Sequence, residues 1–190
     1  MYKRQILFKG EEGNNEAIYR TQYSIEDANK VLAAAGKEPL QFYDAANTNK
    51  YLVDKNGQWS ATAANEYMTT ALTSYNDSNN NMIELVICNN DNMAEGAITA
   101  LNTVGYNLGG NDKTIPVFGV DATDAAKQLI SSGKMVGTIK QDAQEMAKTI
   151  AHLAQNSVKG EDLMKDTGDY TIDEGVKKVR IAYHKYLGNE

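Results

Sequence analysis

Short apolar runs in this chain end abruptly in amides and carboxylates, and each is followed by a segment of helical periodicity. Three such junctions are Ile83–Cys88 before Asn89–Asp91, Ile115–Val120 before Asp121, and Ile6–Phe8 before Gly10–Glu16. This alternation is typical of the α/β fold class, a parallel sheet with helices on both faces. Because the carboxyl ends of parallel strands share one edge, where ligands bind, we expect these polar residues to gather there.

The spacing of apolar residues predicts alternating strands and helices. The strands fall at residues 5–9, 40–43, 83–89, 115–120 and 135–140. The helices fall at residues 14–35, 61–76, 91–104, 123–132 and 142–156. A polar loop is expected at 45–60, a Gly/Asn-rich turn at 105–114, an irregular acidic segment at 161–176 and a last strand at 176–183. Connections as long as 45–60 are often functional.

Composition narrows the class of protein. The chain has 190 residues, of which 42% are hydrophobic, so it can form a globular core and is unlike a disordered chain. Its net charge of −6 argues against nucleic-acid binding, and no apolar run approaches the roughly 20 residues of a membrane span. The single cysteine, Cys88, is expected to be a buried thiol. An edge rich in Asn, Asp and Glu suits a neutral polyhydroxylated ligand better than a phosphate.

Catalytic and metal-binding signatures are mostly absent from the sequence. The two histidines, His152 and His184, lie late in the chain with no cysteine or serine nucleophile motif beside them. No Cys/His cluster indicates zinc, and no glycine-rich phosphate loop is present. Asp54–Gly57 has some character of a calcium loop but lacks the later acidic ligands, so an Asn-Gly turn is the better interpretation. Because no paired carboxylates suggest acid and base roles, the sequence does not predict an enzyme.

Glu16, Arg20 and Trp59 are candidates for contact with a ligand. The i,i+4 spacing places Glu16 and Arg20 on one helix face, either as an ordinary surface ion pair or as a charged fork for ligand hydroxyls. Trp59, the only tryptophan, ends the polar loop between Gln58 and Ser60. Its ring would serve either as a core residue or as an apolar platform for one face of a sugar.

Asn90 and Asp121 each follow a predicted strand and precede a predicted helix. Each side chain could cap its helix or bind a ligand, and the two roles compete for the same oxygen atoms. The neighbouring residues Asp91 and Thr123 could take over capping. In that arrangement Asn90 and Asp121 would be free to bind a ligand.

Four segments in series resemble the periplasmic galactose/glucose-binding proteins of sugar ABC transporters, within the ribose-type solute-binding group. They are Lys9–Arg20, Glu84–Ala94, Ile115–Ala122 and Gly137–Asp142. The likeness is closest over Ile6–Gln141 and weaker through the last strand. It implies a lobe of a two-lobed binding protein, which binds a sugar and catalyses nothing.

The resemblance also assigns roles to particular residues. Arg20, Asn90 and Asp121 match the family's sugar hydrogen-bonding positions, and Trp59 matches the ring that stacks on the sugar. Three further positions depart from the family pattern, namely Glu16 for Asp, Asn14 for His and Gln141 for Asn. These departures keep hydrogen-bonding capacity but change its reach and donor pattern, so the preferred hexose or epimer stays open.

The resemblance suggests that the chain holds the C-terminal lobe of such a protein. Residues 6–141 would form the sugar-binding lobe, and residues 1–5 are interpreted as a cloning or assembly scar. Residues 142–175 would cross to the missing N-terminal lobe, and residues 176–190 would return. No signal peptide is visible before the first predicted strand.

Cofactor, partners and location follow from the same resemblance. The family carries a calcium site, of which Glu84 matches a distant carboxylate, but the loop that supplies the other ligands is missing, so no tight calcium binding is expected. The implied partners are a hexose, the ABC permease and a chemoreceptor, with no nucleic acid and no membrane span. The location would be extracytoplasmic, either in the periplasm or lipid-anchored. The alternative is the effector-binding domain of a LacI-type transcription regulator, which shares the lobe fold.

Overall fold

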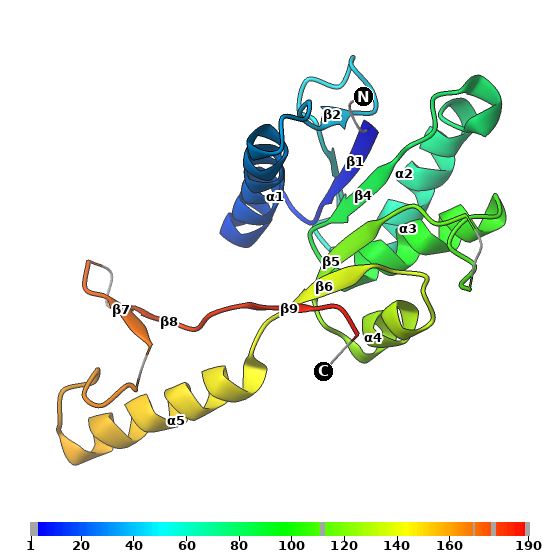
Figure 1. The fold of residues 1–190 in the computed structure, drawn as a ribbon. Helices are drawn as coiled ribbons and strands as arrows, with labels where there is room; N and C mark the ends of the chain where they lie inside the picture. Colours follow the sequence, from blue (N-terminus) through cyan, green and yellow to red (C-terminus); the bar gives the residue numbers. More distant parts are fainter. Residues whose placement is uncertain (1–3, 111–112, 169, 176–177, 189–190) are drawn as a thin grey trace. The chain divides into compact units, whose positions relative to one another are not determined.

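The computed structural model describes residues 4–110, 113–168, 170–175 and 178–188 (Figure 1). These residues form two compact units. The first contains the residues up to Thr138 together with those from Tyr186 onward, and the second contains Ile139–Lys185. Each unit is described by itself. The predicted scar at residues 1–5 lies mostly outside the described residues, since only Arg4 and Gln5 are described, and both belong to a strand.

The first unit alternates strands and helices along the chain. Its elements are β1 (Arg4–Lys9), α1 (Asn15–Ala34), β2 (Gln41–Phe42), β3 (Leu52–Val53), α2 (Ala61–Ser74), a 3₁₀ turn (Asp77–Asn79), β4 (Leu85–Cys88), α3 (Asp91–Thr103), β5 (Val117–Asp121), α4 (Asp124–Ser131) and the first half of β6 (Gly137–Lys140). The first five predicted strands and the first four predicted helices are present, with ends shifted by a few residues. The short strand β3 was not predicted.

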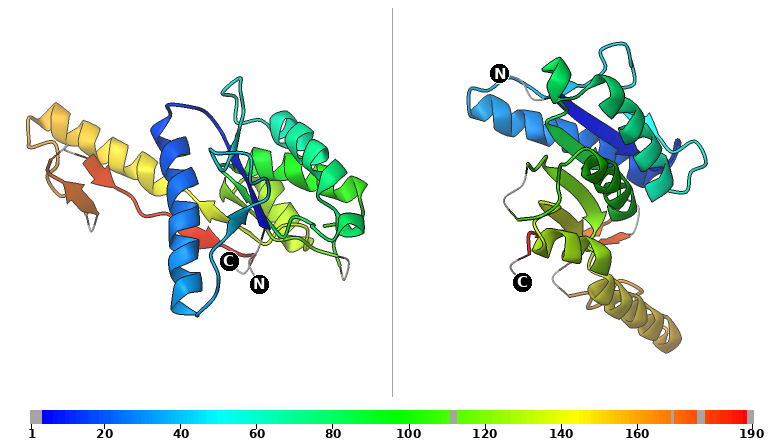
Figure 2. Two further views of the ribbon diagram at one scale, coloured as in Figure 1. Left: turned by 90° about the horizontal axis from the view of Figure 1, so that it is seen from above. Right: turned by 90° about the vertical axis from the view of Figure 1, so that its right-hand side faces the viewer.

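The strands join in one sheet in the order β2-β1-β4-β5-β6-β9, where β9 is His184–Tyr186, and β3 also pairs with β1. The pairs β1–β2, β1–β3, β1–β4 and β4–β5 are all parallel. The register places Ile6 opposite Val86 and Phe8 opposite Cys88. The predicted fold class is therefore confirmed, because a mostly parallel sheet carries helices on both faces. Figure 2 shows α1 on one side of this sheet and α2 and α3 on the other.

The main core lies between the sheet and helices α2 and α3. Ile6 and Phe8 alternate with Leu7 along β1, so the first two face α2 and α3 while Leu7 faces α1. The core also contains Met68 and Leu101, which are completely buried. Burying each such side chain contributes about 1.5–3 kcal/mol relative to leaving it exposed.

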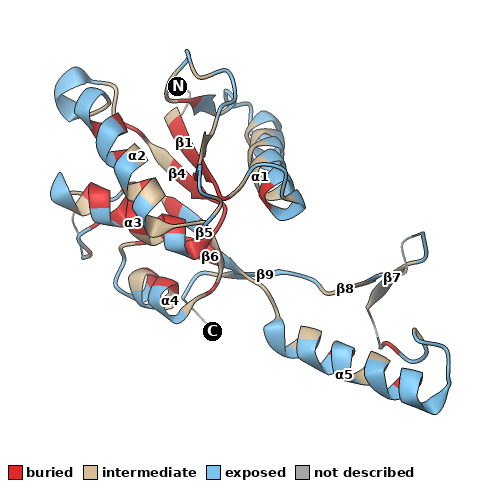
Figure 3. Cartoon of the chain, turned by 180° about the vertical axis from the view of Figure 1, so that it is seen from behind, coloured by how far each residue is buried: buried red, intermediate tan, exposed pale blue. Residues whose placement is uncertain are grey.

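The cover on the opposite face of the sheet is much thinner. Of the residues of α1, only Ala17 is buried. Beneath the helix, a small cluster of Leu7, Phe42 and Ile87 is buried. Figure 3 shows this contrast between buried strands and a largely exposed α1. The first unit is therefore stabilised mainly from the side of α2 and α3.

The second unit contains α5 (Ala143–Lys159) and the antiparallel pair β7 (Thr171–Asp173) and β8 (Lys178–Arg180). Helix α5 ends at Gly160, which adopts φ 70°. The sequence predicted residues 161–176 to be irregular, which is wrong at β7. In place of the predicted last strand at 176–183, the structure has β8 and then β9 (His184–Tyr186), while residues 176–177 lie outside the described part.

Within the described residues, no helix combines the length and the apolar character that crossing a membrane requires.

Candidate functional site

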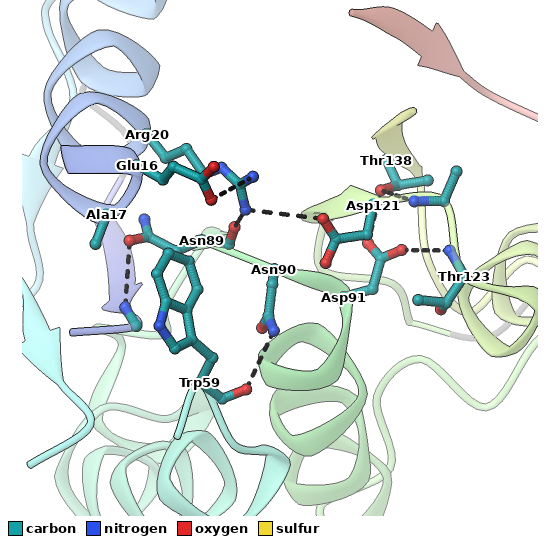
Figure 4. Close-up of polar contacts among 12 residues, drawn as sticks. Glu16, Ala17, Arg20, Trp59, Asn89, Asn90, Asp91, Asp121, Thr123 and Thr138 are labelled. Atoms are coloured by element: carbon teal, nitrogen blue, oxygen red, sulfur yellow. Dashed lines mark hydrogen bonds and ion pairs between the residues drawn. The ribbon is translucent and has the colours of Figure 1, made fainter. Parts of the chain in front are cut away.

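Polar side chains gather where β1, β4 and β5 end. We call this the carboxyl edge, and define it by Arg20, Trp59, Asn90 and Asp121 (Figure 4). Arg20 comes from α1, Trp59 from the loop before α2, Asn90 from the start of α3 and Asp121 from the end of β5. The structure thus brings together four residues that lie far apart in the sequence. This is the arrangement expected when parallel strands end at one edge.

Arg20 is at the centre of the carboxyl edge. One guanidinium nitrogen, Nη1, donates to the Asn89 carbonyl oxygen at 2.9 Å and lies 3.8 Å from Asp121 Oδ1. The other, Nη2, is 3.4 Å from Glu16 Oε2. The guanidinium carbon is 5.5 Å from the centroid of the Trp59 ring, within the range of a cation–π contact. Because the Arg20 side chain is only 13% exposed, the guanidinium is held in place before any ligand arrives.

Glu16 and Asn14 lie at the amino end of α1, beside Arg20. Asn14 caps the helix, because its Oδ1 accepts from the backbone N–H of Glu16 at 2.9 Å and of Ala17 at 3.2 Å. Its side-chain amide donates to Glu11 at 3.2 Å. Glu16 is 63% exposed, so most of its carboxylate can still accept hydrogen bonds. Of this pair, Glu16 therefore has the greater free capacity.

Trp59 is neither a core residue nor a free surface ring. It is half-buried and adopts φ 53°. Its ring lies against Gly10, so closely that a Cβ atom at Gly10 would be 2.0 Å from Trp59 Cδ2. Glycine at position 10 is therefore a steric requirement for this ring position. The Trp59 carbonyl oxygen accepts from Asn90 Nδ2 at 3.2 Å, which ties the loop to the start of α3.

The loop that carries Trp59 is organised by a buried carboxylate. Asp54 accepts from the backbone N–H of Asn56 at 2.9 Å and of Ser60 at 3.0 Å, and from the Ser60 hydroxyl at 2.8 Å. Gly57 N–H closes the turn onto the Asp54 carbonyl at 3.0 Å. Burial of the Asp54 carboxyl opposes its ionisation, but the bonds from Ser60 and Asn56 outweigh burial and lower its pKa. The preferred interpretation of this segment, an Asn-Gly turn, is confirmed.

The helices that follow β4 and β5 are capped by Asn90 and by Thr123. Thr123 caps α4 by accepting from Ala126 N–H at 3.1 Å, which leaves Asp121 out of the cap as expected. At the other strand end, Asn90 itself caps α3 and accepts from Met93 N–H at 3.0 Å, so Asp91 does not replace it. The reason is that the Asp91 carboxylate accepts instead from Thr123 N–H and from the Thr138 hydroxyl.

Asn89 and Asp91 are important residues that the sequence did not single out as candidates. Asn89 is completely buried, and its Oδ1 accepts from Gly10 N–H at 3.2 Å. Asp91 is also completely buried, and it accepts from Thr123 N–H at 2.9 Å and from the Thr138 hydroxyl at 2.6 Å. Burial raises the pKa of Asp91, while the bonds from Thr138 and Thr123 oppose that rise. The signal in the sequence that could have identified Asn89 and Asp91 is their position directly after the buried strand β4.

The remaining two predicted residues are Gln141 and Glu84. Gln141 is half-buried and belongs to the second unit. Glu84 precedes β4 and so lies at its amino end, where its Oε2 accepts from Arg4 N–H at 2.9 Å. The described part of the chain brings no three His, Cys, Asp or Glu side chains into a group that could hold a metal ion. A calcium cage needs several oxygen ligands, so the described residues around Glu84 do not fit one.

A parallel α/β unit with an arginine, a carboxylate, an amide and an aromatic ring at its carboxyl edge defines a small-molecule binding domain. The chain belongs to a family of this class, the one described as "Periplasmic binding protein domain", which it matches over residues 4–162. This membership agrees with the prediction that the protein is not an enzyme. It gives no support to the transcription-regulator alternative.

One curated relative and two solved structures illustrate the similarity. The D-galactose/methyl-galactoside binding periplasmic protein MglB of Haemophilus influenzae is 35% identical over 178 residues, covering 94% of this chain and 46% of that protein. A twin-arginine translocation pathway signal protein from Burkholderia phytofirmans has a TM-score of 0.70 at 23% identity, covering 98% of this chain and 49% of the other. An ABC transporter solute binding protein from Bacillus halodurans, solved with bound myo-inositol, has a TM-score of 0.66 at 25% identity, covering 98% and 52%. The chain thus spans about half the length of the proteins it matches.

Proposed function

We propose that this chain is the sugar-binding lobe of an extracytoplasmic solute receptor of an ABC transporter. We further propose that its ligand is a hexose of the galactose or glucose type. The observation that carries the proposal is the placement of the Arg20 guanidinium. It lies 3.4 Å from Glu16, 3.8 Å from Asp121 and 5.5 Å from the Trp59 ring centroid.

The chemistry of this arrangement suits a ring bearing several hydroxyl groups. A hydroxyl both donates and accepts, so one hydroxyl can accept from Arg20 while it donates to the Asp121 carboxylate. Hydrogen bonds to charged partners are the stronger ones, which compensates for taking the hydroxyls out of water. The Trp59 ring offers an apolar surface for the C–H groups of the ligand.

The comparisons support the same class of ligand without selecting one member of it. The relative from Haemophilus influenzae is named for D-galactose and methyl-galactoside, and the Bacillus halodurans structure holds myo-inositol. All three ligands are ring compounds with several hydroxyl groups. A galactose or glucose preference here is therefore a proposal that a direct comparison of ligands has to test.

The proposed ligand needs a second lobe for tight binding. If half of the contacts are supplied by a lobe outside this chain, affinity should fall from about micromolar to about millimolar. The proposed partners of the complete receptor are the permease of the transporter and a chemoreceptor. The proposed location is outside the cytoplasm.

The decisive experiment is a titration of the isotope-labelled chain with galactose, glucose and myo-inositol, each into the tens of millimolar, followed by backbone amide NMR. We expect shifts to cluster at Arg20, Trp59, Asn90 and Asp121 and to rank the three ligands. Arg20→Lys keeps the charge but loses the planar fork, so it should weaken binding by about tenfold. The matched control Lys30→Arg changes an exposed cation that is paired with Asp27, and it should leave binding unchanged. A dispersed spectrum with no shifts for any of the ligands would overturn the proposal.

A further inference from the structure

The turn that carries Asp121 is conformationally strained. Asp121 has φ 122° and Ala122 has φ 56°. Neither residue is glycine, and side chains rarely adopt positive φ because Cβ crowds the backbone. Two such residues in succession persist only where the surrounding structure fixes them. Contacts that hold this turn therefore also determine where the Asp121 carboxylate points.

A series of hydrogen bonds links the turn to Thr138 in β6 and to Asp91 at the start of α3. Ala122 N–H donates to the Thr138 hydroxyl oxygen at 3.4 Å, and that hydroxyl donates to Asp91 Oδ1 at 2.6 Å. Thr123 N–H donates to the other carboxylate oxygen, Oδ2, at 2.9 Å. The donor and acceptor of each of these hydrogen bonds are fixed, because an ionised carboxylate can only accept. Thr138 and Asp91 are both buried, at 3% and 0% exposure.

The Asp91 carboxylate fits against β5 because residue 119 is a glycine without a side chain. Gly119 is buried in β5, and a Cβ atom built on it would be 2.4 Å from Asp91 Oδ1. Any other residue at position 119 would push the Asp91 carboxylate away from Thr138. Glycine in a strand interior often marks such a close approach.

We propose that Asp91 and Thr138 are positioning residues for ligand binding, which hold the strained turn at Asp121–Ala122 and so keep the Asp121 carboxylate beside Arg20. The inference rests on the proposed sugar-binding function. Neither residue reaches the ligand in this arrangement, since both are buried beneath the turn. Their effect on binding is exerted through Asp121 and its 3.8 Å approach to Arg20.

Threonine variants give the cleanest test, because Thr138→Val keeps the shape of the side chain and removes only the hydroxyl. Thr138→Ser keeps the hydroxyl and loses a methyl group. Thr99→Val is the matched control, since Thr99 is exposed on α3 and its hydroxyl donates to the Glu95 carbonyl in its own helix. For each variant the measurements are the Cα and amide chemical shifts of Asp121 and Ala122, the unfolding free energy, and the dissociation constant for the sugar that binds wild type most tightly.

Thr138→Val should move the shifts of Asp121 and Ala122 away from positive-φ values and weaken sugar binding by about tenfold, the effect of one lost hydrogen bond. Thr138→Ser should restore both readouts, and Thr99→Val should change neither. Gly119→Ala, which displaces Asp91 instead of removing a hydroxyl, should reproduce the Thr138→Val result.

Unchanged shifts at Asp121 and Ala122 in a folded Thr138→Val variant would overturn the positioning role, and so would unchanged sugar affinity. If wild type binds no sugar, the proposed function fails. The shifts in the ligand-free protein still decide whether Thr138 and Asp91 hold the turn.

Discussion

Arg20 and Asn90 were both predicted as ligand-binding residues, and the structure gives them different capacity for that role. The Asn90 side chain already caps α3 and donates to the Trp59 carbonyl, and the residue is 7% exposed. It retains one N–H for a ligand. Arg20 has five N–H groups, of which few are engaged within the protein. Arg20 therefore has more hydrogen bonds available for a sugar than Asn90.

A first prediction concerns the contact between Gly10 and Trp59. Gly10→Ala places a methyl group where the ring lies, so the ring must move. We expect a loss of about 1–3 kcal/mol in unfolding free energy and a shift of the tryptophan emission maximum. Because Trp59 is the only tryptophan, the emission reports this site alone.

A control for Gly10→Ala is Gly175→Ala in the second unit, where the added methyl meets Asp173 at an ordinary 3.4 Å. It should change neither the emission nor the unfolding free energy appreciably. An unchanged emission maximum in Gly10→Ala would contradict the packing of Trp59 on Gly10.

A second prediction concerns pH and Asp54. The folded pKa of Asp54 lies below the unfolded value, so its contribution is fully present above about pH 4 and is lost as pH falls through the folded pKa. The difference in unfolding free energy between wild type and Asp54→Asn should therefore shrink as pH is lowered from 6 toward 3. Urea titrations at several pH values measure it. A difference that stays constant over this range would refute the assignment.

At the scale of elements, the long helices and buried strands were predictable because each has a periodicity of its own. The strand β2 is just two residues long but lies in the apolar run 40–43, whereas β3 and β7 are similarly short runs inside polar segments and were missed. They exist through pairing, β3 with β1 and β7 with β8. Pairing depends on where the partner lies, which a local pattern does not contain.

The supporting residues of the site were missed for a related reason. Asn89 bonds to a backbone group 79 positions away, and Asp91 bonds to Thr138, 47 positions away. The sequence shows that polar residues follow β4, but it does not show which other strand end each one reaches. The four residues of the carboxyl edge could be predicted from the resemblance, whereas the contacts that hold them required the structure.

A third prediction separates the two contacts of Asn90. Asn90→Ala removes the cap of α3 and the bond to Trp59, and should cost about 1–2 kcal/mol of unfolding free energy. Asn90→Asp keeps the capping oxygen and adds a charge that favours a helix amino end. It should therefore retain more stability than Asn90→Ala, while both change the Trp59 emission because both lose the donor.

Chemical denaturation followed by circular dichroism gives the stabilities of these variants. Asn92→Ala, an exposed neighbour in the first turn of α3, serves as control. Equal losses in Asn90→Ala and Asn90→Asp would mean that the cap contributes little.

At the scale of the whole molecule, the described residues around Glu84 offer no calcium cage. The Glu84 carboxylate accepts a hydrogen bond from the Arg4 backbone N–H. The described residues contain no group of three His, Cys, Asp or Glu side chains that could hold a metal ion. As a fourth prediction, micromolar calcium should leave the melting temperature of the chain unchanged relative to a chelator-treated sample. A rise with micromolar calcium would show that the residues present are sufficient for a site.

A fifth prediction concerns helix α5. Its apolar residues Ile150 and Val158 are 66% and 89% exposed, which we interpret as weak packing of this helix among the described residues. We expect the amides of α5 to exchange with solvent much faster than those of β4. Equal protection of the two elements would count against that interpretation.

The pairing of β1 has a consequence for the order in which the molecule assembles. Arg4 and Glu84 bond across a separation of 80 residues, and β1 contacts β2, β3 and β4 through parallel pairing only. At synthesis rates of 5–20 residues per second, roughly 4–16 s therefore pass between the synthesis of β1 and the synthesis of β4. In that interval β2 and β3 can pair with one edge of β1, but the edge that β4 occupies stays open, and such an edge is prone to aggregation. Strand β1 therefore needs protection along that edge while the chain is being made.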